Sequence, residues 1–553
     1  MTGFRCQYNV RVPMRDGVEL SADLYLPGSP RPVPVLVART PYNKNTQLAR
    51  DKAAWYAARG FGFAWMDVRG RGDSDGVFTP YRYEGPDGHD AVEWLAAQPW
   101  CTGQVATWGA SYLGCIQLLT ALTRPPHLAA MVVYVTPSDP WIEWPTGLHV
   151  PQEICWHRMV SGRLLQYVDG TDWMEVYRHL PLLTMDEKAG FYAPHWREDL
   201  SHPPADRAYW QPVTYQDQLA GLDLPALHIT GWYDDVQPGT LINFAALADG
   251  AATERARRAQ RLVVGPWGHE CSRNRPRQLG DIDFGPGADF DLDRYELRWL
   301  QHYLAGQDNG ADAEPRAQIF VMGRNQWRAE DAWPLARTEW ARYHLTSAGQ
   351  ANSRHGDGGL RREQPPGDEP PDVFKHDPAD PVPFLTEPSS AQIGGPDDYA
   401  QVQERADVLV YSTPPLAAEV EVTGPVRVEL FASSSAPDTD FMAKLVDVHP
   451  DGYCQRLCDG MVRARFREGM DREVLMEPGT VYRFEIDLWS TSQVFLAGHR
   501  IRLEIASSAF PKYDRNLGTG GPLGTGTSHQ PAQNTVWHTS AYPSALILPQ
   551  IPA

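Results

Sequence analysis

Short, continuous apolar runs alternate with amphipathic segments through the first quarter of the chain. The apolar runs lie at residues 34–38, 62–68, 104–108 and 129–135, and they predict strands that are covered on both faces. The segments at 51–59, 87–97 and 115–122 have the spacing of helices. Before them, residues 7–26 predict a hairpin around Arg15-Asp16-Gly17. Strands that alternate with helices predict an α/β domain with a parallel sheet.

This alternation is interrupted once. Residues 141–222 are rich in Trp, His and Pro, and they predict helices without clear strands. Apolar runs return at 224–230 and 261–264, and a last helix is expected at 290–304. We therefore interpret residues 141–222 as a helical cap inserted into one α/β domain, which comprises residues 1–140 and 223–315.

The character of the sequence changes at about residue 316. Short alternating runs follow, separated by turns rich in Pro and Gly, a pattern typical of an all-β sandwich or jelly roll. Residues 316–553 are expected to form this domain, with 348–405 as a long surface excursion. The runs lie at 318–322, 408–411, 426–431, 442–448, 481–488, 500–506 and 544–548.

Composition excludes several classes of function. The 553 residues carry a net charge of −19, which argues against a nucleic-acid partner. The apolar runs are too short to span a membrane, and no secretory leader is visible. Seven scattered cysteines indicate reduced thiols and a cytoplasmic location. Cys454 and Cys458 have no second pair of ligands, so we expect neither a metal nor a cofactor. Whether the chain forms a homodimer is left open.

The candidate nucleophile is Ser111. It lies within residues 109–114 (Gly-Ala-Ser-Tyr-Leu-Gly), between a predicted strand and a predicted helix. Small residues permit a sharp strand-to-helix turn, which exposes a side chain at the edge of the sheet. The start of the helix adds free N–H groups beside the serine. By itself such a string is more often an ordinary turn.

An acid and a base follow Ser111 in the order that this type of sheet requires. Asp234 comes after the strand at 224–230, and His269 comes after the strand at 261–264. The carboxyl ends of parallel strands meet at one edge, so the three side chains can converge there. A lone Asp or His in a loop is usually a solvated or capping residue. The triad is predicted because Ser111, Asp234 and His269 occur together in this order, each after a predicted buried strand. Three other residues are weaker candidates. We expect Asp235 to point elsewhere, His228 to pack within a strand, and His89 to begin a helix far from this edge.

Acyl transfer also needs hydrogen-bond donors for the developing oxyanion. One donor is expected to be the backbone N–H of Tyr112, the residue after the nucleophile. A second should come from the loop after the strand at 34–38, where the phenol of Tyr42 is a candidate. Taken alone, Tyr42 is as easily explained as a packed aromatic residue.

Several motifs together resemble the CocE/NonD (cocaine esterase-like) family of serine hydrolases, which is related to Xaa-Pro dipeptidyl peptidases and α-amino acid ester hydrolases. The resemblance runs over nearly the whole chain, including residues 441–448 and 510–516. It implies an α/β-hydrolase domain, a helical cap and a C-terminal jelly roll. It also implies Ser111 as nucleophile, His269 as base, Asp234 as orienting acid, and Tyr42 as oxyanion donor beside the Tyr112 N–H. The motifs that carry it lie at residues 39–42 (Arg-Thr-Pro-Tyr), 67–72 (Asp-Val-Arg-Gly-Arg-Gly), 109–114, 231–234 (Gly-Trp-Tyr-Asp) and 265–269 (Gly-Pro-Trp-Gly-His).

The leading functional hypothesis is a hydrolase of small-molecule carboxylic esters. An amide-directed acylase, a dipeptidyl peptidase-like enzyme, a biosynthetic acyltransferase and a non-catalytic binding protein remain as alternatives. Trp156 is the candidate wall of the substrate pocket, although cap packing explains it equally well. A substrate with a free amino group would need carboxylates in the pocket. The cap offers four such residues, whose orientation the sequence does not define: Glu143, Glu153, Asp169 and Asp172.

Overall fold

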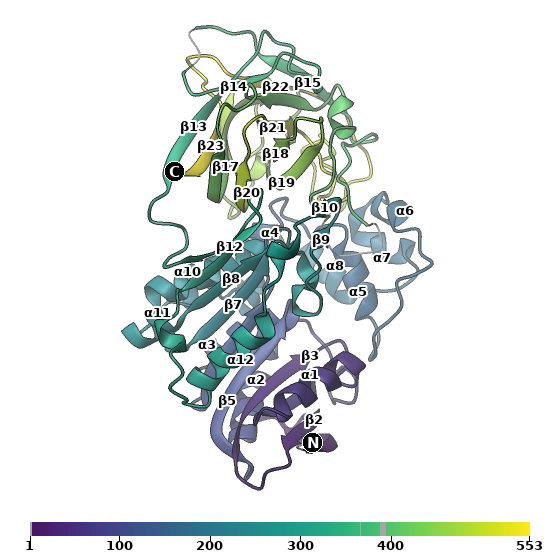
Figure 1. Ribbon diagram of the computed structural model, residues 1–553. Helices are drawn as coiled ribbons and strands as arrows, with labels where there is room; N and C mark the ends of the chain where they lie inside the picture. The colour runs from purple at the N-terminus through teal and green to yellow at the C-terminus, as the bar shows by residue number, and fades with distance from the viewer. Residues whose placement is uncertain (1–2, 365–366, 388–393, 553) are drawn as a thin grey trace.

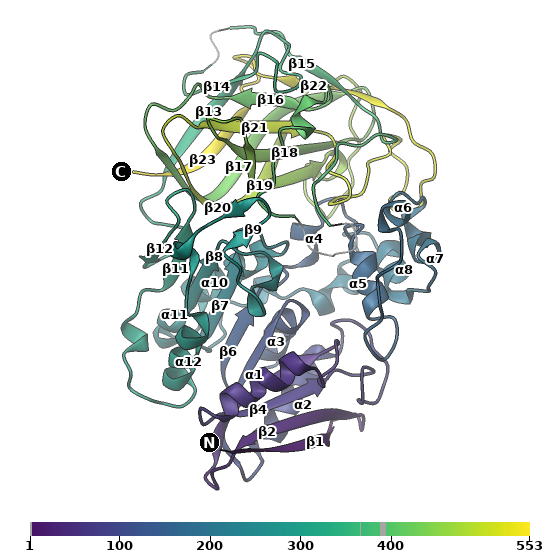
Figure 2. The same cartoon turned by 45° about the vertical axis from the view of Figure 1, so that its right-hand side comes forward.

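The computed structural model describes residues 3–364, 367–387 and 394–552. A sheet covered by helices forms one half of the molecule, and an all-β domain forms the other (Figure 1). The cap helices lie to one side, between these two halves (Figure 2). The α/β class, the helical cap and the C-terminal all-β domain predicted from the sequence are therefore confirmed.

The sheet of the α/β domain is largely parallel. Neighbouring strands run parallel from β4 to β11, with antiparallel strands at both edges. The loops after β5, β7 and β8 therefore open on one edge of the sheet. In spatial order the strands are β1 (Phe4–Pro13), β2 (Glu19–Pro27), β4 (Gly62–Asp67), β3 (Val33–Thr40), β5 (Cys101–Ala110), β6 (Leu128–Tyr134), β7 (Ala226–Gly231), β8 (Arg261–Gly265), β11 (Ala317–Val321) and β12 (Gln326–Glu330).

Two apolar cores hold the helices on opposite faces of this sheet. Tyr56 of α1 and Trp299 of α12 belong to one core, and Val92 of α2 and Leu247 of α10 belong to the other. Both faces are buried, as the continuous apolar strands predict. The helices of this domain are α1 (Gln47–Ala57), α2 (Glu84–Ala96), α3 (Tyr112–Leu122), α10 (Gln237–Gly250), α11 (Glu254–Ala259) and α12 (Leu292–Tyr303).

One strand lies in a different sheet from the one expected. The run at 318–322 was assigned to the β-rich region that begins at 316, but β11 pairs in parallel with β8. It then forms a hairpin with β12, which closes the edge of the α/β sheet. The pattern of a short strand shows that one exists, but it does not identify the neighbour with which the strand pairs. The α/β sheet therefore extends to Glu330.

The cap connects β6 to β7. Its helices are short, and Trp196, Trp173 and Tyr177 form the centre of their own apolar core. Trp196 and Trp173 are therefore packing residues of the cap. The cap helices are α4 (Pro140–Glu143), α5 (Glu153–Met159), α6 (Trp173–Tyr177), α7 (Met185–Lys188), α8 (Pro194–Ser201) and α9 (Arg207–Trp210).

The all-β domain encloses a core of its own. Two strands, β14 and β15, come from the segment at 348–405, so part of the expected surface excursion belongs to the sheet. A separate two-stranded pair, β9 (Gln278–Leu279) and β10 (Ile282–Asp283), follows β8. The strands of the domain are β13 (Glu339–Thr346), β14 (Gly359–Arg361), β15 (Asp372–His376), β16 (Leu409–Ser412), β17 (Val420–Ser434), β18 (Asp440–Val448), β19 (Cys454–Arg463), β20 (Tyr482–Phe495), β21 (Arg500–Ala506), β22 (Ala532–Trp537) and β23 (Ala545–Ile551).

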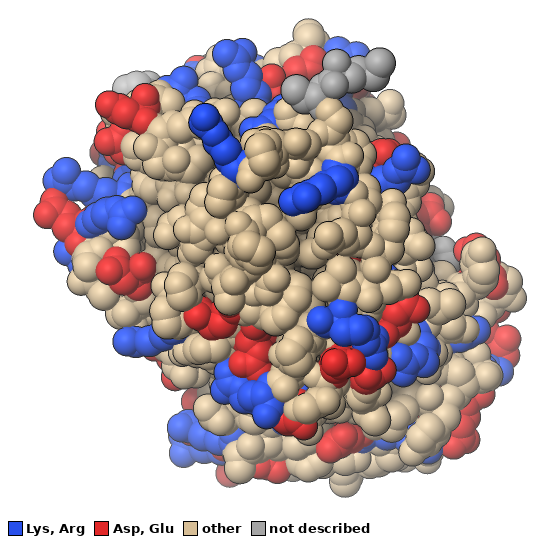
Figure 3. All heavy atoms as spheres, turned by 90° about the horizontal axis from the view of Figure 1, so that it is seen from below, with Lys and Arg blue, Asp and Glu red and all other residues tan. Residues whose placement is uncertain are grey.

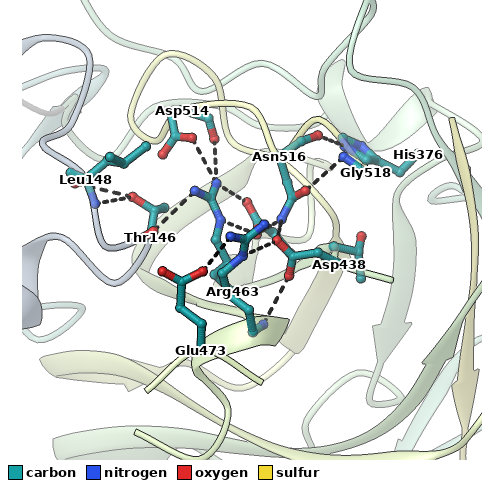
Figure 4. A network of polar contacts seen from close by, with 12 residues as sticks. Thr146, Leu148, His376, Asp438, Arg463, Glu473, Asp514, Asn516 and Gly518 are labelled. Carbon is teal, nitrogen blue, oxygen red and sulfur yellow. Dashed lines mark hydrogen bonds and ion pairs between the residues drawn. The ribbon is translucent and has the colours of Figure 1, made fainter. Parts of the chain in front are cut away.

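A buried network joins this domain to the cap (Figure 4). The Arg463 guanidinium pairs with Asp440 at 2.9 Å and with Asp514 at 3.0 Å, and it donates to the backbone oxygen of Thr146 at 3.2 Å. Removing one partner of a buried ion pair typically costs about 3–5 kcal/mol, because the other charge is left unpaired. The β domain thus holds the cap segment that leads into α5.

The surface carries both signs of charge. On the face shown in Figure 3, basic and acidic side chains are interspersed, without the continuous basic surface that nucleic acid needs. All seven cysteines are free thiols, and all except Cys6 are buried. In the part of the chain that the structure describes, no helix has both the length and the apolar character required to cross a bilayer.

Candidate active site

Ser111 occupies a strained turn between β5 and α3. Its φ of 60° lies in the left-handed region, which residues with a side chain rarely adopt. The Ser111 N–H donates to the Tyr134 backbone oxygen at 3.0 Å, which ties the turn to the end of β6. A strand-to-helix turn with this conformation exposes the serine Oγ at the sheet edge. The predicted position of the nucleophile is thus matched by the backbone geometry it requires.

Close packing explains the glycines around the turn. A Cβ at Gly109 would lie 2.4 Å from the Cβ of Leu113. A Cβ at Gly114 would lie 2.6 Å from Thr136 Oγ1 and 2.8 Å from the Tyr134 backbone oxygen. A side chain at either position would push α3 away from the sheet. The glycine three residues after Ser111 therefore has a structural cause of its own.

His269 and Asp234 meet at the same edge. His269 Nδ1 lies 2.7 Å from Asp234 Oδ1, where the imidazole N–H donates to the carboxylate. The Thr230 hydroxyl donates to Asp234 Oδ2 at 2.6 Å, and the Val236 N–H donates to Oδ1 at 3.2 Å. These bonds fix the carboxylate, which in turn fixes the ring. His269 Nε2 is left as the nitrogen that can accept a proton.

The two loops that carry this pair are packed against each other. A Cβ at Gly231 would lie 2.0 Å from the backbone oxygen of Trp267, and a Cβ at Gly265 would lie 2.3 Å from the Trp267 ring. The Tyr233 N–H donates to the Trp267 oxygen at 3.0 Å. The glycines and the tryptophan of the two motifs thus hold the loops in contact, so that Asp234 faces His269.

Asp235 does not point elsewhere, so that expectation is wrong. Its Oδ1 lies 2.8 Å from His269 Nδ1 but makes no hydrogen bond with any residue that the structure describes, and the Nδ1–H donates to Asp234 instead. Burial lowers the pKa of His269, but the charges of Asp235 and Asp234 outweigh it and raise that pKa well above its ordinary value. Burial raises the pKa of Asp235, but the neighbouring His269 lowers it below the usual range. The signal in the sequence for a second carboxylate beside His269 was the pair of adjacent acids, Asp234 and Asp235, in one loop.

Tyr42 and Trp156 contact each other beside the start of α3. The Trp156 indole N–H donates to the Tyr42 hydroxyl at 2.9 Å, and the Trp156 ring stacks 5.9 Å from the ring of Tyr112. Since the Tyr42 oxygen accepts this bond, its own proton is free to donate. Burial raises the pKa of Tyr42 to about 12, which keeps the phenol protonated. Trp156 therefore both lines a cavity and orients Tyr42.

Tyr112 places a backbone N–H at the start of α3. It is the first residue of α3, so its N–H has no acceptor within the helix. Its side chain points away into a buried network, where its hydroxyl donates to Glu84 Oε1 at 2.7 Å and Arg39 pairs with Glu84 at 2.8 Å. This network anchors the first turn of the helix beside Ser111. Glu84 was not predicted as part of the site, because its helix was expected to begin only at residue 87, whereas α2 begins at Glu84.

A cavity of about 100 Å³ lies between the cap and the α/β domain. Val236 and Trp156 line it, which connects it to the loop of Asp234 and to Tyr42. Its wall mixes aromatic and polar side chains, as is usual for a small-molecule site. Six of the cap residues that line it are Glu143, Trp144, His149, Glu153, His157 and Asp199.

The four cap carboxylates fall into two groups. Glu143 and Glu153 line the cavity, whereas Asp169 and Asp172 are exposed on the surface. Burial raises the pKa of Glu143 to about 8, and its carboxyl group is hydrogen-bonded to Ser138. Burial also raises the pKa of Glu153. The described cavity thus has two carboxyl groups whose surroundings favour the neutral form.

Known proteins resemble this chain over its whole length. Residues 16–270 match the model of the X-Pro dipeptidyl-peptidase (S15 family), and residues 309–547 match that of the X-Pro dipeptidyl-peptidase C-terminal non-catalytic domain. A cocaine esterase from Rhodococcus sp. (strain MB1 Bresler) is 36% identical over 98% of both chains. The crystal structure of an aminopeptidase from the marine sediment archaeon Thaumarchaeota archaeon has a TM-score of 0.87 at 26% identity, covering 100% of this chain and 96% of the other. An α-amino acid ester hydrolase, at 24% identity, has the same fold, with a TM-score of 0.87 and coverage of 99% and 97%.

A strained serine after β5, a hydrogen-bonded His and Asp after β8 and β7, and an inserted cap are typical of serine hydrolases with the α/β-hydrolase fold. With the 36% identity over nearly its full length, the chain belongs to the CocE/NonD family of these enzymes.

Proposed function

We propose that this enzyme hydrolyses carboxylic esters through an acyl-enzyme intermediate. Ser111 Oγ attacks the carbonyl carbon while His269 Nε2 accepts its proton, and Asp234 holds the ring in the required tautomer. The observation that carries the proposal is the 2.7 Å hydrogen bond between His269 and Asp234, at the edge that also exposes Ser111. An orienting acid fixed by Thr230 and a strained serine are the features that this chemistry needs.

The oxyanion of the tetrahedral intermediate would accept two hydrogen bonds. The first comes from the Tyr42 hydroxyl, whose oxygen is already engaged by Trp156, and the second comes from the Tyr112 N–H. Collapse of the intermediate breaks the ester C–O bond, and the alcohol leaves with the proton held on His269. Water then attacks the acyl-enzyme while His269 accepts its proton, and collapse of this second intermediate breaks the bond to Ser111 Oγ, which takes the proton back from His269 as the acid leaves. The cycle balances without a cofactor.

An ester substrate fits the cavity better than one with a free ammonium group. An ammonium group would need an ionised carboxylate, yet burial raises the pKa of both Glu143 and Glu153. Asp199 is closer to ionised but is bonded to His149. This is why we place ester hydrolysis before the aminopeptidase and acylase alternatives. An acyltransferase differs only in the acceptor that replaces water, and it remains an alternative.

A substrate panel tests the proposal. Purified enzyme and Ser111→Ala should be assayed with p-nitrophenyl acyl esters and with an aminoacyl-proline anilide. We expect turnover of the esters, at least 100-fold slower turnover of the anilide, and loss of both in the variant, whose circular dichroism should match that of the wild type. Faster cleavage of the anilide would overturn the ester assignment. Equal ester turnover by Ser111→Ala would overturn the mechanism.

A further inference from the structure

Three polar side chains of the cap converge at the cavity. We call His149, His157 and Asp199 the cap cluster. His149 comes from the loop before α5, His157 from α5, and Asp199 from α8. One ligand atom from each lies within 4.8 Å of the others. All three line the cavity described above, so the cluster faces a space that a small molecule can enter.

The hydrogen-bonding capacity of the cap cluster is only partly used. His149 Nε2 lies 3.1 Å from Asp199 Oδ2, but His149 Nδ1 is buried without a partner. The His157 side chain is buried, and its ring nitrogens make no hydrogen bond with any residue that the structure describes. Buried polar groups nearly always have a partner, so two incompletely bonded imidazoles at one point need an explanation.

We propose that the cap cluster binds one divalent transition-metal ion, most favourably Zn²⁺, and leaves one coordination position open to the cavity. Two imidazole nitrogens and one carboxylate oxygen form a ligand set that Zn²⁺ accepts, and three protein ligands with one open position are typical of reactive rather than structural zinc. The open position takes water or an oxygen atom of a bound molecule. This site faces the same cavity as the proposed ester substrate, but it includes none of Ser111, His269 and Asp234 and does not rest on the proposed ester hydrolysis.

The distances fit this assignment after a small movement. Zinc bonds of about 2.0–2.2 Å place the ligand atoms of a tetrahedral site roughly 3.4 Å apart. The pair His149–Asp199 is already at 3.1 Å, so His157 needs to approach by roughly 1 Å. The Tyr209 hydroxyl donates to Asp199 Oδ1, an outer hydrogen bond of the kind that orients metal-binding carboxylates.

Two other clusters of the described residues are weaker candidates. Asp234, Asp235 and His269 form the catalytic pair with its neighbour, where His269 Nδ1 is bonded to Asp234. The other cluster, in the β domain, consists of Asp447, His449 and His499, which are hydrogen-bonded to one another or to neighbouring protein side chains. Asp447 accepts from His499 and from Gln493, and His449 is bonded to Gln455.

Metal titration tests the proposal. Chelator-treated full-length protein should be titrated with Co²⁺, followed by its visible absorption, and with Zn²⁺ by calorimetry. We expect one equivalent to bind with tetrahedral Co²⁺ absorption. His157→Gln should weaken binding by about 100-fold or more, and Tyr209→Phe by about 10-fold.

The control is His499→Gln, which removes the matching imidazole of the β domain and should leave the titration unchanged. Should His157→Gln fail to fold, zinc-edge anomalous diffraction from soaked wild-type crystals decides the matter, with a peak expected between His149, His157 and Asp199. Wild-type protein that binds no metal overturns the proposal, as does metal that is lost in His499→Gln or located elsewhere. Ester hydrolysis is not read in any arm, so its failure would be seen separately.

Discussion

At the edge of the α/β sheet and in the cap, imidazole and carboxylate side chains lie close together, yet the two regions shift the pKa of an imidazole in opposite directions. At the edge, burial is outweighed by the charges of Asp235 and Asp234, and the pKa of His269 rises well above its ordinary value. In the cap, burial lowers the pKa of His157 to about 3, and the neighbouring His149 adds to this shift. Burial lowers the pKa of both imidazoles, so the difference between them comes from their charged neighbours.

The two regions also differ in how their side chains are held. Asp234 and His269 lie on loops at the ends of adjacent parallel strands, β7 and β8, where the sheet sets their spacing. The cap residues lie on helices of four to eight residues or on the loops between them, and their positions depend on packing around Trp196 and on the hydrogen bond from Arg463 to Thr146. We therefore expect substitutions at the edge to reduce turnover, and substitutions in the cap to affect selectivity and stability.

The largest expected effect separates the two adjacent acids of the edge. Asp234→Asn should lower kcat by about 10⁴-fold, because an amide N–H that donates to Nδ1 holds the imidazole in the wrong tautomer and the charge that stabilises the imidazolium is lost. Asp235→Asn is the matched control, since it removes a neighbouring charge that makes no hydrogen bond, and it should cost less than about 10-fold. Steady-state kinetics on one ester checks both. Similar losses for the two variants would mean that the orienting role is shared.

The oxyanion side should show the next largest effect. Tyr42→Phe should lower kcat by about 10²–10³-fold, because one donor to the oxyanion is lost. Trp156→Phe keeps an aromatic wall but removes the bond that orients Tyr42, and it should cost roughly 10-fold. Full activity of Tyr42→Phe would show that the second donor lies elsewhere.

The pH profile tests the role of charge at the edge. His269 must be neutral to accept a proton, so kcat/KM should rise with pH through a pKa above the ordinary imidazole value. Asp235→Asn removes a charge that raises this pKa, so the acidic limb should move to lower pH. An unchanged limb would mean that Asp235 does not contribute to the pKa of His269.

The smallest effect is expected in the cap and concerns stability. Burial raises the pKa of Glu143 to about 8, above its value of 4.5 in the unfolded chain. Its contribution to the stability of the fold is therefore fully present below pH 4.5, and it is lost as the pH rises through 8. Glu143→Gln never ionises, so its Tm relative to the wild type should increase between about pH 5 and pH 9, by roughly 2–5 °C. Thermal unfolding at the two pH values measures this. A constant difference would contradict the neutral carboxyl group.

Sequence patterns predicted the strands and their order, which place residues at the edge of the sheet. They did not predict features that depend on tertiary contacts between distant segments. The strands before Ser111, Asp234 and His269 were found because buried parallel strands are continuous apolar runs, and their order defines the edge. The sheet that β11 joins and the approach of Asp235 to His269 depend on contacts between distant segments. In the cap, short helices have too few turns for periodicity to orient a side chain, so the convergence of His149 with Asp199 was invisible.

Reaction with an alkyl fluorophosphonate, followed by intact mass and peptide mapping, shows whether Ser111 is a nucleophile activated at the sheet edge. We expect one adduct per chain, on Ser111, formed in parallel with loss of ester hydrolysis and absent from Ser111→Ala. Complete inactivation with the adduct on another residue, or full activity after Ser111 is modified, would contradict it.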